Sequence, residues 1–355
     1  MFSSKKSHRL VSLDIGTSSI KAMELDVQGA RPKLLAAASV PTPAEAIKNN
    51  AVSRPDLVAA AITTMLEAND IAAKEAIICL PGPTAFTKLI NSSASSLKEI
   101  NDNIAFEAGN YIPHKISSVF FDYQVIGKSD KGGFRVMLVA VKNEIVESYL
   151  SAVRQAGLEP IIADVDYFAL ENMFEINYPD ERDKTQVLVD IGAKYASVNI
   201  MQGGQSIFVG DVGVGGRLYT EALAEQLQIS IQDAENLKLG GGDGKAKTQI
   251  AETLDRINEH IASELHRQIG FYWNAAATEK PLEAVYISGG GSVVPGFIDE
   301  VSAKTGLPVH RINPFRNIEC GKGFDEAYLA EISPAMATSV GLASRRTGDK
   351  VQAAA

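Results

Sequence analysis

The residues best suited to chemistry in this sequence lie in one short segment near its start. An apolar run, Leu10–Leu13, ends on an aspartate and continues into a turn that carries glycine, hydroxyl groups and a lysine. Glycine lets a ligand come close to the backbone, hydroxyl groups and turn amides donate to phosphate oxygens, and a carboxylate holds a cation through water. The residues with these properties are Asp14, Gly16, Thr17, Ser18 and Lys21. This segment alone leaves two interpretations open, a phosphate site and a plain turn between two strands.

The same pattern returns in the second half of the chain. The apolar run Val187–Val189 leads to Asp190 and Gly192, and two further strands end at a glycine-rich turn, Gly213–Gly216, before a helix begins. Strand, Asp-Ile-Gly, strand, strand and helix therefore occur twice, which indicates an internal duplication at the scale of a domain. Two such turns facing each other would hold a triphosphate, because each offers amides to phosphate and a carboxylate to a shared metal ion.

Glycines and other small residues near the end of the chain complete this set. The apolar strand Leu282–Ile287 is followed by Gly289, Gly290 and Gly291, which leave room for a flat group such as a purine ring against the backbone. A helix of small residues is predicted at Ser333–Ala343, where it would let the two halves of the molecule approach closely.

The composition limits the class of protein. Among 355 residues, 34 Lys and Arg stand against 43 Asp and Glu, and the net charge of −9 argues against nucleic-acid binding. Cys79 and Cys320 lack a metal-like spacing and fit a reduced cytosolic protein. No apolar stretch is long enough to span a bilayer and the tail Arg345–Ala355 is not an amphipathic helix, so we expect no direct membrane insertion.

Periodicity predicts alternating strands and helices along the chain and divides it into parts. A small α+β unit at 84–160 interrupts the first domain (1–83), which resumes at 161–184 and closes with a helix at 333–346. The second domain covers 185–332, and 347–355 is a frayed tail. The unit at 84–160 is predicted from strands Phe86–Ile90, Val119–Ile126 and Phe134–Val141 and helices Leu97–Ala108 and Ile145–Ala156. In the second domain, a loop is predicted at Gly240–Gly244 and one long amphipathic helix at Gln249–Ala276.

These motifs together resemble those of the actin-like ATPase superfamily, which includes actin, DnaK-type chaperones, sugar kinases, FtsA and PilM. Asp14–Lys21 is similar to its first phosphate motif, Asp190–Gly192 to the second and Ser288–Phe297 to the adenosine motif. Within the superfamily the PilM family is most similar, by the position of the insert and by Glu107–Pro113, Phe121–Gly127, Asp164–Leu170 and Ala234–Lys238. The resemblance implies an α/β actin-like fold, in which two duplicated domains flank a nucleotide cleft and carry an FtsA/PilM-type inserted α+β subdomain.

The resemblance also implies ATP and Mg²⁺ as cofactors and gives each motif residue a role. Asp14, Gly16, Thr17, Ser18 and Lys21 would contact the phosphates, Asp190 and Gly192 the opposite side, Asp14 and Asp190 the metal through water, Gly215 and Gly216 the ribose, and Glu235, Lys238, Gly289, Gly290 and Gly291 the adenosine. Glu264 and Arg267 are further candidates beside the base. Two plainer alternatives remain: Lys21 as a surface lysine at a strand edge, and Glu235 with Lys238 as an ion pair on a helix surface.

Catalysis would rest on two carboxylates. Asp164 and Asp166, at the end of the predicted strand Ile161–Asp166, are the only candidates for a base or for positioning water. A phosphotransferase would also need an acceptor pocket, so we expect a slow ATPase at most. An FtsA-like filament-forming scaffold and a small-molecule kinase of the sugar-kinase type remain as alternatives.

The implied function is that of a cytoplasmic, ATP-binding protein of type IV pilus assembly. PilM-like proteins reach the inner membrane by binding the N-terminal cytoplasmic tail of PilN, and the resemblance implies such a partner, other pilus assembly proteins and a homo-dimer or polymer. Helix Leu97–Ala108 and the segment Tyr111–Pro113 place apolar residues beside acidic ones, so we predict that a peptide with apolar anchors and basic ends docks there. The alternative is that these apolar residues pack the core of the insert itself.

Overall fold

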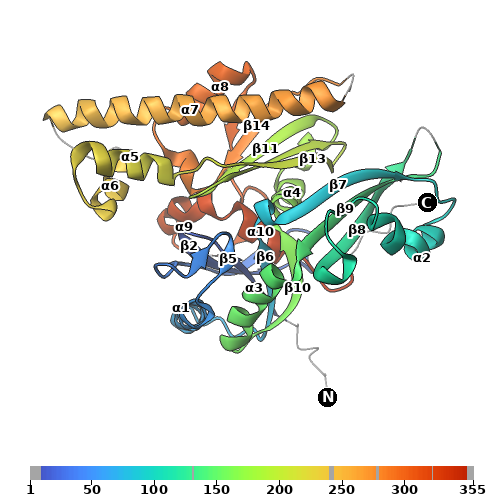
Figure 1. Ribbon diagram of the computed structural model, residues 1–355. Coiled ribbons are helices and arrows are strands. Elements are labelled where there is room, and N and C mark those ends of the chain that lie inside the picture. The colour runs from blue at the N-terminus through green and yellow to red at the C-terminus, as the bar shows by residue number, and fades with distance from the viewer. Residues whose placement is uncertain (1–8, 130–131, 240–243, 277–279, 322, 350–355) are drawn as a thin grey trace.

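A computed structural model describes residues 9–129, 132–239, 244–276, 280–321 and 323–349. Side chains are described in these ranges except at 244–246 and 273–276. Two β-sheets lie one above the other in Figure 1, with two helices between them, and a third, smaller sheet projects to one side. The predicted α/β architecture with two large sheets is therefore confirmed.

The first sheet is built around the start of the chain. In sheet order its strands are β10 (Glu159–Val165), β6 (Glu75–Leu80), β1 (Leu10–Ile15), β2 (Ser19–Asp26), β3 (Lys33–Pro41) and β16 (Glu319–Cys320). Helices α1 (Pro55–Ala68) and α3 (Asn143–Gln155) cover one face, and a short hairpin, β4 (Ile47–Lys48) and β5 (Ala51–Val52), precedes α1. Because β1 lies between β2 and β6, the turn that follows β1 is held by a strand on either side.

The second sheet repeats this arrangement. Its order is β13 (Gln205–Val212), β12 (Ala196–Gln202), β11 (Thr185–Ile191), β14 (Ala284–Ser288) and β15 (Val309–Arg311). Its outer face is covered by α5 (Arg217–Leu227), α6 (Ile231–Lys238), α7 (Gly244–Ala276) and α8 (Phe297–Thr305). The β11–β12 hairpin and its neighbour β14 match the β1–β2 hairpin and its neighbour β6, as the repeated motif predicts.

The long helix α7 follows from its apolar periodicity. The predicted core positions are all buried: Ile250, Leu254, Ile257, Ile261, Leu265 and Ile269. The helix begins earlier than predicted, at Gly244, and the rest of the predicted loop, 240–243, lies outside the described residues. Although α7 has 33 residues, neither it nor any other helix in the described parts of the chain is long and apolar enough to cross a bilayer.

Helices α4 (Asp166–Asn177) and α10 (Ala337–Ala343) lie between the two sheets. They touch where Gly341 faces α4, since a Cβ on Gly341 would lie only 1.6 Å from the carbonyl oxygen of Ala169. The predicted single helix Ser333–Ala343 is wrong in its first turn, which is the 3-10 turn η5 (Ser333–Ala335). There the carbonyl of Pro334 accepts a hydrogen bond from the amide of Gly289 (2.6 Å), which ties this turn to the glycine-rich loop after β14.

The inserted unit contains a three-stranded antiparallel sheet and one helix. Its strands lie in the order β7 (Ala85–Ser92), β9 (Phe134–Lys142) and β8 (Val119–Lys128), and α2 (Leu97–Ala108) packs on them. The 3-10 turn η1 (Gly82–Thr84) leads into β7, and η2 (Ile116–Ser118) precedes β8. Helix α3, in contrast, buries Val146 and Tyr149 in the core of the first sheet. The boundaries drawn for 84–160 and for the other parts remain a prediction.

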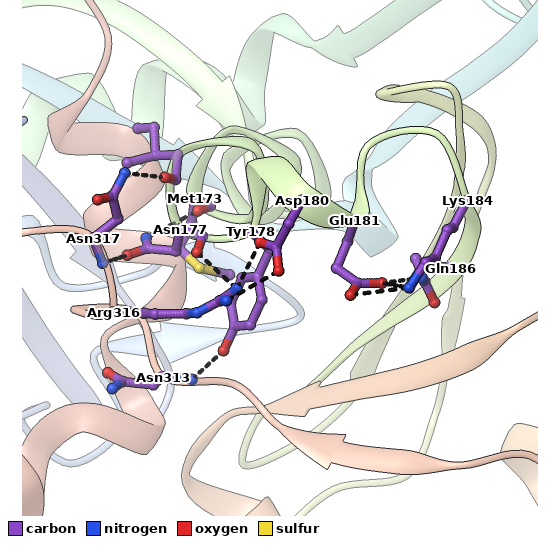
Figure 2. Close-up of polar contacts among 11 residues, drawn as sticks. Met173, Asn177, Tyr178, Asp180, Glu181, Lys184, Gln186, Asn313, Arg316 and Asn317 are labelled. Carbon is purple, nitrogen blue, oxygen red and sulfur yellow. Dashed lines mark hydrogen bonds and ion pairs between the residues drawn. The ribbon is translucent and has the colours of Figure 1, made fainter.

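Two residues of the second half, Arg316 and Asn317, make polar contacts with the end of α4 (Figure 2). Arg316 lies over the ring of Tyr178 (4.7 Å to its centroid) and makes a bidentate ion pair with Asp180 in η3 (Pro179–Glu181). The amide of Asn317 donates to the side-chain oxygen of Asn177 (2.8 Å). The chain then continues to β16, which joins the first sheet beside β3, and to α9 (Glu326–Ile332). One strand inside 185–332 therefore belongs to the first sheet.

Candidate functional site

Two hairpin turns with the same geometry face one cavity. In the β1–β2 turn, the amide of Gly16 donates to the carbonyl of Ser19 (3.0 Å). In the β11–β12 turn, the amide of Gly192 donates to the carbonyl of Tyr195, also at 3.0 Å. A Cβ on either glycine would approach that same carbonyl to about 3 Å or less, so both turns need glycine to remain this tight.

The cavity between the turns, the hairpin cleft, has a volume of about 410 Å³. Of the predicted site residues, the structure places these on its wall: Asp14, Gly16, Thr17, Ser18, Lys21, Asp166, Asp190, Gly192, Gly216, Glu235, Lys238, Gly289, Gly290 and Gly291. Asp164, Gly215, Glu264 and Arg267 are not on it. Glu264 and Arg267 pair with each other, and Arg267 is largely exposed.

Two carboxylates and one lysine come together on the wall of the hairpin cleft. Lys21 donates to Asp14 at 2.8 Å across neighbouring strands, and both side chains are largely buried. Burial would lower the pKa of Lys21, but Asp14 and Asp190 raise it above its ordinary value, so the lysine is charged. The surface-lysine alternative is therefore wrong.

Asp190 joins Asp14 and Lys21 on this wall from the second hairpin. Burial raises the pKa of Asp190, and a hydrogen bond from Ser288 (2.7 Å) and the charge of Lys21 oppose this rise. Two carboxyl groups thus meet one ammonium group, and the excess of carboxyl oxygens suits a bound cation. Within the described residues, no three or more His, Cys, Asp or Glu side chains group closely enough to hold a metal. A metal ion here would therefore need water or ligand oxygens to complete its coordination.

The three consecutive glycines differ in what surrounds them. A Cβ on Gly289 would lie 2.3 Å from the carbonyl oxygen of Ile191, and one on Gly291 would lie 2.4 Å from the side chain of Ile191. Both positions thus need glycine for packing against β11. A Cβ on Gly290 would meet nothing within 4 Å, although Gly290 lines the hairpin cleft. Only Gly290 therefore keeps space free for a ligand.

Helix α6 contributes a polar cluster to one side of the hairpin cleft. Glu235 accepts hydrogen bonds from Lys238 and from the hydroxyl group of Thr220 on α5. The side chain of Lys238 is only 8% exposed, so the pair is not the ordinary surface ion pair that its spacing alone would allow. A Cβ on Gly216 would lie 3.3 Å from the Cα atom of Gly291 and 3.7 Å from the amine of Lys238, so this amine lies beside the glycine loop.

The two candidate catalytic carboxylates point to different places. Asp166, the first residue of α4, faces the hairpin cleft and accepts from Gly82 (3.1 Å), Tyr195 (2.8 Å) and Ser197 (3.1 Å). Burial outweighs these donors and raises the pKa of Asp166 to about 6. Asp164 instead forms an ion pair with Arg345 and lines a different cavity.

That second cavity, the insert cavity, has a volume of about 1050 Å³ and lies between the inserted unit and α4. Its wall combines apolar side chains with carboxylates and cations. The apolar residues include Leu97, Val125, Met137, Val139 and Phe168, and the carboxylates are Asp122, Asp164, Glu171, Glu175, Glu181 and Asp349. Of the apolar residues of helix Leu97–Ala108, Leu97 lines this cavity, whereas Ile100 and Ile104 pack the core of the insert, as the plainer alternative proposed.

A family model described as "Type IV pilus assembly protein PilM" matches residues 12–347. The chain belongs to the PilM family. The solved structure of a PilM-PilN type IV pilus biogenesis complex contains a chain that is 28% identical and superposes with a TM-score of 0.83, over 94% of this chain and 97% of that chain. The predicted family is therefore confirmed.

Two more distant structures share the fold with this PilM-family chain. The ethanolamine utilization protein EutJ from Carboxydothermus hydrogenoformans is 17% identical with a TM-score of 0.57, over 94% of this chain and 88% of that one. MreB5 of Spiroplasma citri bound to ADP is 11% identical with a TM-score of 0.53, over 88% and 93%. The predicted actin-like ATPase fold is confirmed by this set.

Several residues of the hairpin cleft escaped the sequence analysis. Tyr195 and Lys194 lie in the second hairpin turn, and the phenol of Tyr195 holds Asp166. Ile231, at the start of α6, is 56% exposed although it is apolar, and it lines the cleft beside Glu235. A cationic and a hydroxyl-bearing residue at the second and third positions after the glycine of Asp-Ile-Gly were the available signal for the first two. Nothing in the pattern of α6 distinguishes Ile231 from an ordinary helix residue.

Proposed function

We propose that this PilM-family protein binds Mg-ATP in the hairpin cleft and acts as a nucleotide-dependent assembly protein of a type IV pilus machine. It would work in the cytoplasm and bind the N-terminal cytoplasmic tail of a PilN-like inner-membrane protein. The observation that carries the nucleotide part is the pair of equivalent hairpin turns around one cleft, with free space above Gly290.

The residues of the cleft fit a nucleoside triphosphate. Thr17, Ser18 and the amides of both turns would donate to phosphate oxygens, and Lys21 would balance part of their charge. Asp14 and Asp190 would hold Mg²⁺ through water molecules. At the other end, Glu235 and Lys238 would bind the sugar and the base would lie above Gly290.

Bound Mg²⁺ would neutralise phosphate charge, and the residues of this chain favour binding over turnover. Asp166 already accepts four hydrogen bonds from the protein, so it has little freedom to orient a water molecule. We therefore expect hydrolysis well below ~1 s⁻¹, the low end for ordinary enzymes. A faster rate would favour the kinase alternative.

The insert cavity is the best candidate for the partner's tail. Its volume and its mixed wall suit an extended peptide with apolar and basic side chains, whereas the hairpin cleft is less than half as large. A PilM-PilN complex exists for the 28% identical chain, which supports a partner of this kind. Contacts with other pilus proteins and a homo-dimer or polymer stay predictions.

Two titrations test this function separately. Calorimetry with Mg-ATP should show binding that the double substitution Asp14→Ala and Asp190→Ala removes. A synthetic peptide of the PilN-like tail should bind with a Kd in the micromolar range, ~8 kcal/mol. Its affinity should be the same for the double variant in the absence of nucleotide, because the two cavities share no described wall residue. Unchanged ATP binding in the double variant would show that the hairpin cleft is not the nucleotide site.

A further inference from the structure

Glu171 is an unusual residue in the middle of α4. Its carboxylate lines the insert cavity, and its partners are the amide (3.3 Å) and the hydroxyl group of Ser206 on β13. Burial raises the pKa of Glu171 to about 7, and the nearby carboxylates Glu175 and Asp164 add to this rise. In the parts of the chain that the structure describes, no lysine or arginine nitrogen lies within 4.0 Å of it.

Among the described residues, four cations line the insert cavity, Lys98, Arg182, Lys184 and Arg345, and none of them lies within 4.0 Å of Glu171. Arg345, from the segment after α10, pairs with Asp164 and with Asp349. Lys184 pairs with Glu181 at 3.0 Å. On α4 itself, burial raises the pKa of Glu175 and the charge of Arg182 opposes this rise, so Arg182 is placed to balance Glu175. Glu171 is thus a wall carboxylate with hydrogen-bond acceptor capacity left over and no cation of its own.

We propose that Glu171 is the residue of the insert cavity that receives one lysine or arginine side chain of the partner's tail. This inference rests on the proposed function, because it takes the tail to lie in the insert cavity. The serine donors fix the orientation of the carboxylate, and the remaining lone pairs accept from the incoming cation. Apolar residues of the wall, such as Val125 and Phe168, hold the rest of the peptide.

A pH dependence follows from this contact. Below about pH 7 Glu171 binds a proton in the free protein, and that proton must leave when the cationic side chain binds. The affinity for the peptide should therefore fall as the pH drops from about 8 to about 6, by about tenfold, since each pH unit below the pKa costs up to tenfold. A structural role of Glu171 alone would leave this profile flat.

The test is a double-mutant cycle on the full chain. Glu171→Gln should weaken binding of the PilN-like tail peptide by at least about tenfold, the usual effect of removing one member of a desolvated charge pair. A set of peptide copies carries glutamine in place of each lysine or arginine, one at a time. The peptide copy that lacks the cation paired with Glu171 should bind equally well to the parent and to Glu171→Gln. The matched control is Glu147→Gln on the exposed face of α3, which should bind like the parent.

The outcomes distinguish a failure of this inference from a failure of the proposed tail-binding function. If the parent binds no tail peptide, the proposed partner function fails. If the parent binds the tail peptide, and every glutamine copy loses the same factor in affinity for Glu171→Gln as for the parent, the assignment of Glu171 is wrong. If Glu171→Gln does not fold, the pH profile of the parent decides: a flat profile between about pH 6 and 8 overturns the inference, and a fall at low pH supports it.

Discussion

Substituting Asp211 should remove a pH dependence from the stability of this protein. Asp211 on β13 meets Asp166 on α4 across Gly82, since a Cβ on that glycine would lie 2.5 Å from an oxygen of Asp211 and 2.8 Å from one of Asp166. That oxygen of Asp211 is buried and accepts no hydrogen bond within the described structure. Burial first, and then the charge of Asp166, raise the pKa of Asp211 to about 8.

The sign and size of the effect follow from proton linkage. An unfolded aspartate titrates near pH ~4, so between about pH 4 and 8 the folded state binds a proton at Asp211 that the unfolded state lacks. The free energy of unfolding therefore falls by up to ~1.4 kcal/mol for each unit of rising pH in that window and is level above it. Between about pH 6 and pH 8.5 the loss attributable to Asp211 is about 2.5 kcal/mol.

Urea unfolding at several pH values from about 6 to 9, without nucleotide, measures this loss. Asp211→Asn keeps the size of the side chain and stays neutral, so its free energy of unfolding should fall less with pH than that of the parent. Asp166 and Glu171 titrate in both proteins, so the difference between the two profiles reports Asp211 together with its coupling to Asp166. Asp56→Asn, at an exposed position, should run parallel to the parent. Parallel profiles for Asp211→Asn and the parent would refute the argument.

Three other predictions follow from the hairpin cleft and from the contacts of Arg316 at the end of α4. Asp14→Ala or Asp190→Ala should each weaken Mg-ATP binding about 10- to 100-fold in calorimetry, the effect of losing one charge-assisted contact, and unchanged affinity in both would contradict the water-mediated metal site. Gly290→Val should keep the melting temperature of the parent and lose its shift with ATP, whereas Gly291→Val should not fold stably because of its contact with β11. Arg316→Ala should lower the free energy of unfolding by about 1 kcal/mol, and no change would mean that the exposed ion pair and ring contact in Figure 2 contribute nothing.

Local patterns in the sequence determined the elements of this fold and the parts of the nucleotide site. Each Asp-Ile-Gly turn follows an apolar strand, and a tight hairpin depends on residues that are neighbours in the chain. The same holds for α7, whose predicted core positions are all buried. For this reason most predicted residues around the phosphates and Gly290 line one cleft.

Tertiary structure alone decided how distant residues combine at this site. Asp164 and Asp166 are two positions apart and look equivalent in the sequence, but α4 begins at Asp166 and turns it toward the hairpin cleft, while Asp164 pairs with Arg345. Asp211 shows no motif, and it meets Asp166 only because β13 packs against η1. Such contacts join residues far apart in the chain, so their pKa values and partners depend on how the two sheets pack, which no local pattern records.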